Sequence, residues 1–388
     1  MKIRTDCDRR AFLQSLGATA AALWLSPTKI CMGSNAPTSP VSVAKCRAYG
    51  PEVLPTLRTM FDQLGGLETL VKGKTVAIKL NLTGGANDRL GSLPVERTHW
   101  VHPQVIGATV HLLDKAGAQR IRLLESPWNT ANPLEEFMLQ ANWAPRDFTS
   151  AARRVEFENT NYLGNGKRYS RLPVSGGGLM FKAWDLNHSY EDCDVFVSLA
   201  KLKEHSTAGV TLSMKNCFGI TPVTIYGEGA GVDRPSEMPR GGRGMLHSGK
   251  REPSRSAPGE NDLWSPRDPG YRVPRVTVDL VAARPVHLAV IDGIEAMAGG
   301  EGPWVKGTRP LHPGMLVAGT NCVSTDAVAA ALMGFDPMSE RGAAPFEKCD
   351  STLRLAEQCG IGTRDLRRIE VLGSSISSAR YNFRRAAA

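Results

Sequence analysis

Lysine and histidine residues alternate directly after one apolar segment. The run 194–199 (DVFVSL) leads into Lys201, Lys203 and His205. If a strand continues through them, the three side chains project from one face. Two ammonium groups beside an imidazole form an anion-binding group, and crowded lysines lower one another's pKa toward the range of a general base. We predict Lys203 and His205 as catalytic residues and Lys201 as a substrate-binding residue; the alternative is a solvated strand end.

Other apolar segments also end in residues that could bind a ligand. These polar residues are Lys79 and Asn81, Glu125 and Ser126, Asp292, and Lys215 with Asn216. Ligands of open parallel sheets bind at the carboxyl ends of the strands. We therefore predict that Lys79, Asn81, Lys215 and Asn216 also bind the substrate. Each residue alone has the alternative of being an ordinary exposed residue at a strand end.

Acidic residues are candidates for binding a divalent metal. Glu125, Asp292, Glu295, Glu301 and Asp326 carry carboxylates, the ligands that hard cations prefer. We name Asp292 and Glu125 as the metal ligands, with a metal-free site as the alternative; Asp326 could instead cap its helix. The cysteines form no C-x-x-C pair, so neither an iron–sulfur cluster nor a thiolate zinc site is expected. The sequence identifies no other cofactor.

Alternating strand and helix patterns must position these residues. A strand at 75–80, a helix that begins at His102-Pro103 and a strand at 120–124 predict a β–α–β unit. Further strands are expected at 194–199, 287–291 and 315–318, and helices near 53–64, 276–283 and 325–332. The fold class is therefore α/β, with a mostly parallel central sheet flanked by helices. Residues 226–272 are rich in Gly, Pro and Arg and predict a long loop insertion or lid.

The N-terminal residues are typical of a targeting signal. Arg9 and Arg10 precede Phe12 and Leu13, and the apolar run 16–25 is too short to span a bilayer. We predict a twin-arginine (Tat) signal peptide over 1–36, with an amphipathic first helix as the alternative. The Tat translocase is then a partner during export, and the protein is located in the periplasm or another extracytoplasmic space. After cleavage no segment is apolar enough to span a membrane.

The remaining chain divides into a lead segment and one domain. Residues 37–74 form the lead, and residues 75–388 form the α/β domain with its core at 75–337. The net charge is +9, but arginine is spread along the chain without a focused basic stripe. Nucleic-acid binding is therefore not expected, whereas an anionic small-molecule ligand fits this balance.

Four segments resemble the bacterial and archaeal family known as domain of unknown function 362. They are 76–82, 102–118, 194–219 and 291–329, and the pair Lys-Leu-Lys-x-His and Lys-Asn-x-Phe-Gly is the most specific feature. The resemblance implies an α/β fold with a cofactor or substrate site, and no general reaction. Many members carry ferredoxin-like iron–sulfur motifs, which this sequence lacks.

The sequence thus favours an exported enzyme that acts on an anionic small molecule through a basic Lys/His site, with or without a divalent metal. Two alternatives stay open. One is a non-catalytic protein that binds an anionic ligand or cofactor, and the other is an accessory protein for maturing another exported enzyme.

Overall fold

The computed structural model describes residues 36–128, 130, 132–163, 168–228, 241–249 and 257–384. These residues belong to one compact unit, 33–388. The predicted signal peptide lies outside the described residues apart from its last position. Parts of the predicted insertion, 229–240 and 250–256, lie outside them as well.

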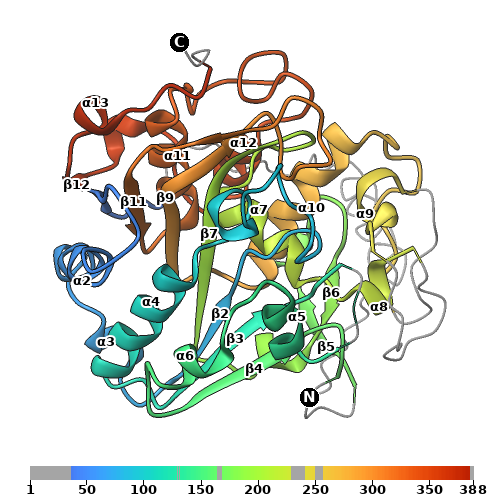
Figure 1. Cartoon of the computed structure of the whole chain (residues 1–388). Coiled ribbons are helices and arrows are strands. Elements are labelled where there is room, and N and C mark those ends of the chain that lie inside the picture. Colours follow the sequence, from blue (N-terminus) through green and yellow to red (C-terminus); the bar gives the residue numbers. More distant parts are fainter. Residues whose placement is uncertain are drawn as a thin grey trace, which may run out of the picture. The chain divides into compact units, whose positions relative to one another are not determined.

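Within the described part of the chain, ten strands form a mixed sheet (Figure 1). The order is β12-β1-β11-β9-β7-β2-β3-β4, with β8 beside β7 and β10 beside β9. All neighbours from β9 to β4 are parallel, whereas β1–β11 and β11–β9 are antiparallel. The strands are β1 (Val41–Lys45), β2 (Thr75–Lys79), β3 (Arg120–Glu125), β4 (Val155–Asn159), β7 (Val195–His205), β8 (Gly209–Val210), β9 (Leu288–Ala298), β10 (Arg309–Leu311), β11 (Met315–Gly319) and β12 (Val371–Gly373). The predicted α/β class with a mostly parallel sheet is confirmed.

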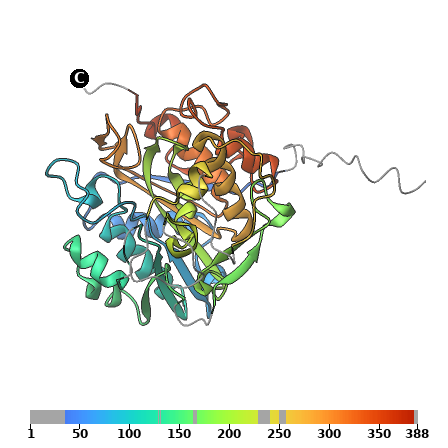
Figure 2. The same ribbon diagram turned by 90° about the vertical axis from the view of Figure 1, so that its right-hand side faces the viewer.

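Helices cover both faces of the sheet because successive strand residues point to opposite sides. Val76 and Ile78 belong to one buried cluster, whereas Ala77 belongs to the other. The first cluster includes α2 (Val53–Gln63), α3 (Glu68–Val71), α4 (Pro103–Lys115), α5 (Leu134–Gln140) and α6 (Pro145–Thr149). The second includes α7 (Leu212–Asn216), α8 (Val223–Tyr226), α9 (Gly244–Ser248), α10 (Pro269–Ala283), α11 (Cys322–Leu332), α12 (Thr352–Gln358) and α13 (Ile376–Ala379). Figure 2 shows the orange and red helices of the second group together on one side.

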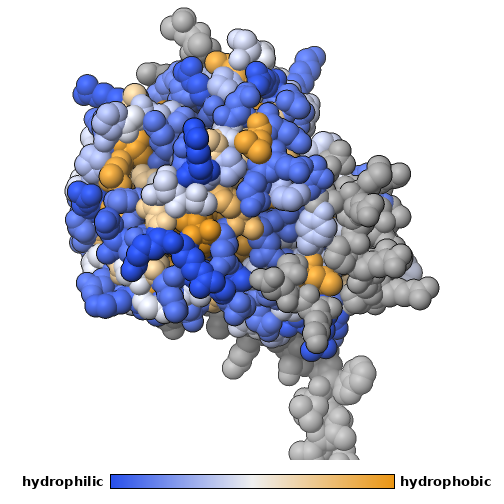
Figure 3. Space-filling view, turned by 60° about the horizontal axis from the view of Figure 1, so that its bottom comes forward, coloured by the Kyte–Doolittle hydropathy of each residue, from blue (hydrophilic) through white to orange (hydrophobic). Residues whose placement is uncertain are grey.

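Short elements complete the chain. Strands β5 (Ser170–Pro173) and β6 (Ala183–Leu186) form a separate antiparallel pair. Five 3-10 helices lie in the described residues: η2 (Val95–Arg97), η3 (Ser175–Gly177), η4 (His188–Tyr190), η5 (Cys217–Ile220) and η6 (Leu366–Arg368). In the described part of the chain, no helix has the length and apolar character needed to cross a bilayer. The face in Figure 3 is mostly hydrophilic, with hydrophobic residues in patches between polar ones.

The largest differences from the predicted elements concern their extent. Strand β7 continues to His205, six residues beyond the apolar run, and β9 continues to Ala298. The segment 37–74, expected as a separate lead, contributes β1, which pairs with β11 and β12 in the main sheet. Helix α10 begins at Pro269, inside the predicted insertion.

Candidate functional site

A pocket with two chambers lies where β2, β3 and β7 end. We define the inner chamber, of about 90 Å³, by Lys79, Asn81, Leu82, Glu125, Ser126, Thr211, Asn216 and Gly219. The outer chamber, of about 400 Å³, is lined by Asp88, Gly242, His247, Glu301 and Trp304. The two adjoin because they share Thr83, Gly84, Trp128, His205, Lys215, Phe218 and Arg243. The pocket thus occupies the sheet edge at which α/β proteins bind ligands.

A buried ion pair forms the floor of the inner chamber. Lys79, at the end of β2, places its Nζ 2.5 Å from Oε1 of Glu125, at the end of β3. Burial lowers the pKa of Lys79, and the Glu125 carboxylate opposes this shift. A Cβ at Gly219 would lie 3.0 Å from the Lys79 Nζ, so the absence of a side chain at residue 219 leaves room for the pair. The charge of Lys79 is therefore matched within the protein.

Lys215 is a cation without such a partner. Its Nζ lies 4.1 Å from the ring centroid of Phe218, and no hydrogen bond or ion pair joins it to a residue in the described ranges. Burial lowers its pKa from 10.5 to about 7; Glu301 opposes the shift, and Arg243 adds to it. A lysine in this state exchanges a proton near neutral pH.

Arg243 is the second cation of the pocket wall. Its Nε and Nη2 donate to the carbonyl oxygen of Thr221, and Nη2 also donates to the carbonyl and hydroxyl oxygens of Ser126. These acceptors are uncharged, and no carboxylate among the described residues forms an ion pair with Arg243. Burial lowers its pKa to about 10, so the guanidinium stays charged at neutral pH. No sequence pattern distinguishes Arg243 from the other arginines of the stretch 226–272.

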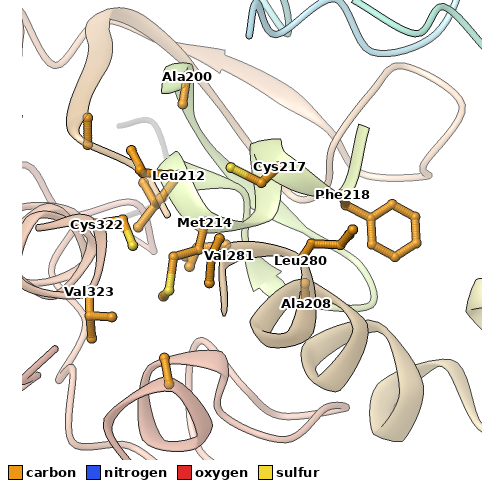
Figure 4. Packing of buried hydrophobic residues seen from close by; sticks show 14 of the residues in the cluster. Ala200, Ala208, Leu212, Met214, Cys217, Phe218, Leu280, Val281, Cys322 and Val323 are labelled. Carbon is orange, nitrogen blue, oxygen red and sulfur yellow. The ribbon is translucent and has the colours of Figure 1, made fainter. Parts of the chain in front are cut away.

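The short helix α7 holds Lys215 in place. Asp326, on α11, accepts hydrogen bonds from the backbone N–H groups of Ser213 and Met214 at 2.9 Å and from the Ser213 hydroxyl at 2.5 Å. Leu212 enters the helix with a left-handed φ of 44°. Figure 4 shows Met214 beside Val281 of α10 in the apolar core. Asp326 therefore caps α7 and not its own helix α11, which is capped by Asn321.

Asn216 ties the strands below the pocket together. Its Nδ2 donates to the Ser198 hydroxyl at 3.0 Å and to the carbonyl oxygens of Lys79 and Leu199 at 3.3 and 3.4 Å. Asn81 similarly accepts the backbone N–H of Lys201 at 3.2 Å. Both amides line the inner chamber, but their hydrogen bonds mainly fix β2, β7 and α7 relative to one another.

His205 reaches the pocket from the end of β7. Its Nδ1 accepts a hydrogen bond from the backbone N–H of Thr207 at 3.2 Å and lies 3.6 Å from Oε2 of Glu301. Burial, together with the nearby Lys215, lowers the pKa of His205 well below 6.5. The ring is therefore neutral at neutral pH, and the Thr207 contact assigns its proton to Nε2. Burial raises the pKa of Glu301, but His205 and the N–H of Ser206 lower it more, so that the pKa lies below its ordinary value.

Lys203 lies beneath the pocket wall and does not line either chamber. Its Nζ donates to the carbonyl oxygens of His99 at 2.7 Å and Glu301 at 3.0 Å, and to Thr83 Oγ1 at 3.2 Å. All three acceptors are uncharged, and burial lowers the pKa of Lys203 well below 10.5. Its amine is thus covered by the loops around residues 83–99 and 301.

Lys201 and Asp292 form a separate buried pair. Neither side chain is exposed, and Nζ lies 3.0 Å from Oδ2. The Tyr49 hydroxyl lies within hydrogen-bond distance of both groups, and the backbone N–H groups of His102 and Ile294 also donate to Asp292. Neither residue lines the inner or outer chamber. The alternation predicted for Lys201, Lys203 and His205 therefore brings only His205 to the pocket.

The residues predicted as metal ligands do not fit one metal site. Glu125 lines the inner chamber, and its oxygens accept from Leu82 N, Ser126 N and Lys79. Asp292 lies outside the pocket with both oxygens engaged. Across the described ranges, no group of three or more His, Cys, Asp or Glu side chains could hold a metal ion.

Several pocket residues were not predicted from the sequence. Thr211 is buried, and its hydroxyl has no hydrogen-bond partner among the described residues. Trp128, Phe218, His247 and Trp304 supply aromatic surface in the outer chamber. The Trp128 and Trp304 side chains are separated by long stretches of sequence from the basic residues, so no local spacing connected them.

The fold and the pocket define an α/β protein with a basic site at the carboxyl edge of its sheet. The chain belongs to the family described as domain of unknown function (DUF362), whose profile matches residues 76–331.

Two further proteins are similar to it. The thylakoid-associated protein sll1697 of Synechocystis sp. is 28% identical over 189 residues, which are 47% of this chain and 50% of that protein. The chain therefore matches about half the length of this relative. A crystal structure of a protein from Thermotoga maritima has a TM-score of 0.34 and 16% identity, and covers 69% of this chain and 55% of that chain.

Proposed function

We propose that this protein binds a small anionic molecule in the inner chamber and acts on it as an enzyme. The observation that carries the proposal is the pair Lys215 and Arg243, two cations that face one small chamber and form no ion pair with a carboxylate of the described residues. Removing a charge from water is unfavourable by several kcal/mol unless an opposite charge compensates it. A bound anion supplies that compensation.

Uncharged donors in the chamber support the same proposal. The buried Thr211 hydroxyl has no partner among the described residues, and such groups are normally satisfied in proteins. His205 carries its proton on Nε2 and can donate to a ligand while it stays neutral. The chamber of about 90 Å³ has the size of a compact anionic group rather than of a whole substrate.

Lys215 is the residue that we propose as the catalytic group. An amine with a pKa of about 7 exchanges its proton near neutral pH, and a bound anion favours its protonated form, so Lys215 can donate a proton to the ligand as a general acid. We propose positioning roles for Lys201 and Lys203, because neither residue lines the two chambers.

Export through the Tat pathway remains a separate proposal. It is supported by the Arg9–Arg10 pair and by the short apolar run 16–25. The location outside the cytoplasm and the Tat translocase as a transient partner follow from that signal.

Isothermal titration with inorganic phosphate tests the binding proposal. We expect the wild-type protein to bind phosphate and Lys215→Met to bind it at least ~10-fold more weakly, since a charge-assisted hydrogen bond is lost. Lys45→Met removes the same charge from an exposed position on β1 and should bind like the wild type. Equal phosphate affinity in all three proteins would refute the site.

A further inference from the structure

The outer chamber is walled by two tryptophans that remain partly exposed. Trp128 is 40% exposed and Trp304 is 49% exposed, although both line a chamber of about 400 Å³. Tryptophan side chains are on average well buried in proteins. Cavities of about 400 Å³ are typical of sites that bind small molecules. The two indoles thus offer apolar surface inside a ligand pocket.

Glycines make room for both indoles. A Cβ at Gly84, where φ is +79°, would lie 2.5 Å from the Trp304 ring, and a Cβ at Gly302 would overlap the same ring. A Cβ at Gly241 would overlap Trp128. Three glycines from different loops therefore permit the close approach of these rings to the backbone.

Trp304 is also held at its edge. Its Nε1 donates to Oε1 of Glu301 at 3.3 Å, and its ring meets His99 edge to face at a centroid distance of 5.7 Å. These contacts fix the indole while half of its surface stays accessible. A fixed and accessible aromatic ring costs little ordering entropy when a planar ligand packs on it.

The charges of the pocket give a ligand one orientation. Asp88 and Glu301 line only the outer chamber, whereas Glu125 in the inner chamber is neutralised by Lys79, and Lys215 and Arg243 lie on the wall that both chambers share. An anionic group is therefore repelled from the outer chamber and attracted to the inner one. The uncharged part of the ligand is left against the tryptophans.

We propose that the ligand is an anion joined to a planar aromatic or heteroaromatic ring. Its anionic group lies in the inner chamber, and its ring packs against Trp304 and Trp128 in the outer chamber. This proposal rests on the anion site proposed above and adds the class of molecule that the site takes.

Three phosphates of known shape test the proposal by isothermal titration. Phenyl phosphate carries a planar ring, cyclohexyl phosphate carries a ring of similar size that is not planar, and inorganic phosphate carries none. We expect phenyl phosphate to bind ~10-fold more tightly than either of the others, a difference of ~1.4 kcal/mol, because a planar ring stacks on an aromatic side chain.

Variants locate the effect. Trp304→Ala should abolish the preference for phenyl phosphate and leave the affinity for inorganic phosphate unchanged, which also shows that the variant is folded. Trp264→Ala, at a position that is 94% exposed and lines neither chamber, should behave like the wild type.

The outcomes separate the two proposals. Suppose that inorganic phosphate binds, but phenyl phosphate binds no more tightly than inorganic phosphate or no more tightly than cyclohexyl phosphate. The aromatic ligand is then refuted, and the anion site stands. If the preference for phenyl phosphate persists in Trp304→Ala and in Trp128→Ala, the assigned surface is refuted. If none of the three phosphates binds, the anion site itself is refuted.

Discussion

Replacing Lys215 by methionine should change how the stability of the protein depends on pH. The amine has a pKa of about 7 in the folded chain and an ordinary value of 10.5. Between these values the unfolded chain holds a proton that the folded chain has released. The free energy of unfolding of the wild type therefore rises with pH across this window. Below pH 7 the buried charged amine destabilises the folded protein to its full extent.

The size of the effect follows from the two pKa values. A difference from 10.5 to about 7 corresponds to ~5 kcal/mol at 1.36 kcal/mol per pKa unit. Lys215 is half-buried and open to the pocket, so solvent screening reduces this figure, and we expect roughly 2–4 kcal/mol. Lys215→Met retains the length of the apolar stem and removes the titrating group.

Urea unfolding at pH 7 and pH 10, followed by circular dichroism, measures the difference. Other lysines and tyrosines titrate in both proteins, so the quantity of interest is the free energy of unfolding of the variant minus that of the wild type. This difference should favour the variant at pH 7 and shrink by roughly 2–4 kcal/mol by pH 10. A difference that is the same at both pH values would refute the claim that the buried amine has no ion-pair partner among the described residues.

Three further changes have defined outcomes. Glu125→Gln leaves the buried Lys79 ammonium unpaired and should lower the free energy of unfolding by ~3–5 kcal/mol. The matched change Glu68→Gln in an exposed pair should have little effect, and similar losses at both sites in urea unfolding would contradict this. Burial raises the pKa of Asp326 from 3.8 to about 7, so its ionisation opposes folding. Between pH 4 and pH 7 the free energy of unfolding of the wild type should therefore fall by roughly 2–4 kcal/mol more than that of Asp326→Asn. Parallel curves of stability against pH for the two proteins would refute this prediction. Changing Arg9–Arg10 to Lys-Lys should leave an uncleaved precursor in the cytoplasm of a Gram-negative host; an unchanged periplasmic product in cell fractionation would rule out Tat export.

Local sequence patterns predict the elements that enter the pocket but not their full length. The β–α–β unit from Thr75 to Glu125 follows from apolar periodicity and from the His102-Pro103 start. Strand β7 is longer than its apolar run, because the polar side chains in its second half form hydrogen bonds and ion pairs with groups far away in the chain. Lys203, for example, donates to the His99 carbonyl, and Lys201 pairs with Asp292. Such long-range partners leave no periodic signal around residue 203.

Local patterns predict those residues of the candidate site that follow apolar segments, and they miss those that depend on long-range contacts. Lys79, Lys215 and His205 were found because they follow apolar segments, and parallel strands bring their ends to one edge. Arg243 was missed because it lies in a stretch with many arginines and binds Ser126 and Thr221 through long-range contacts. Spacing alone cannot show which amine is covered by a loop and which faces a cavity.

A crystal soaked in tungstate shows directly whether the inner chamber binds an anion, because the anomalous signal of tungsten locates the anion. We expect one strong peak in the inner chamber, within hydrogen-bond distance of Lys215 Nζ and the Arg243 guanidinium, and no such peak in crystals of Lys215→Met. Tungstate bound only at surface lysines, with the inner chamber free of it, would refute the anion site.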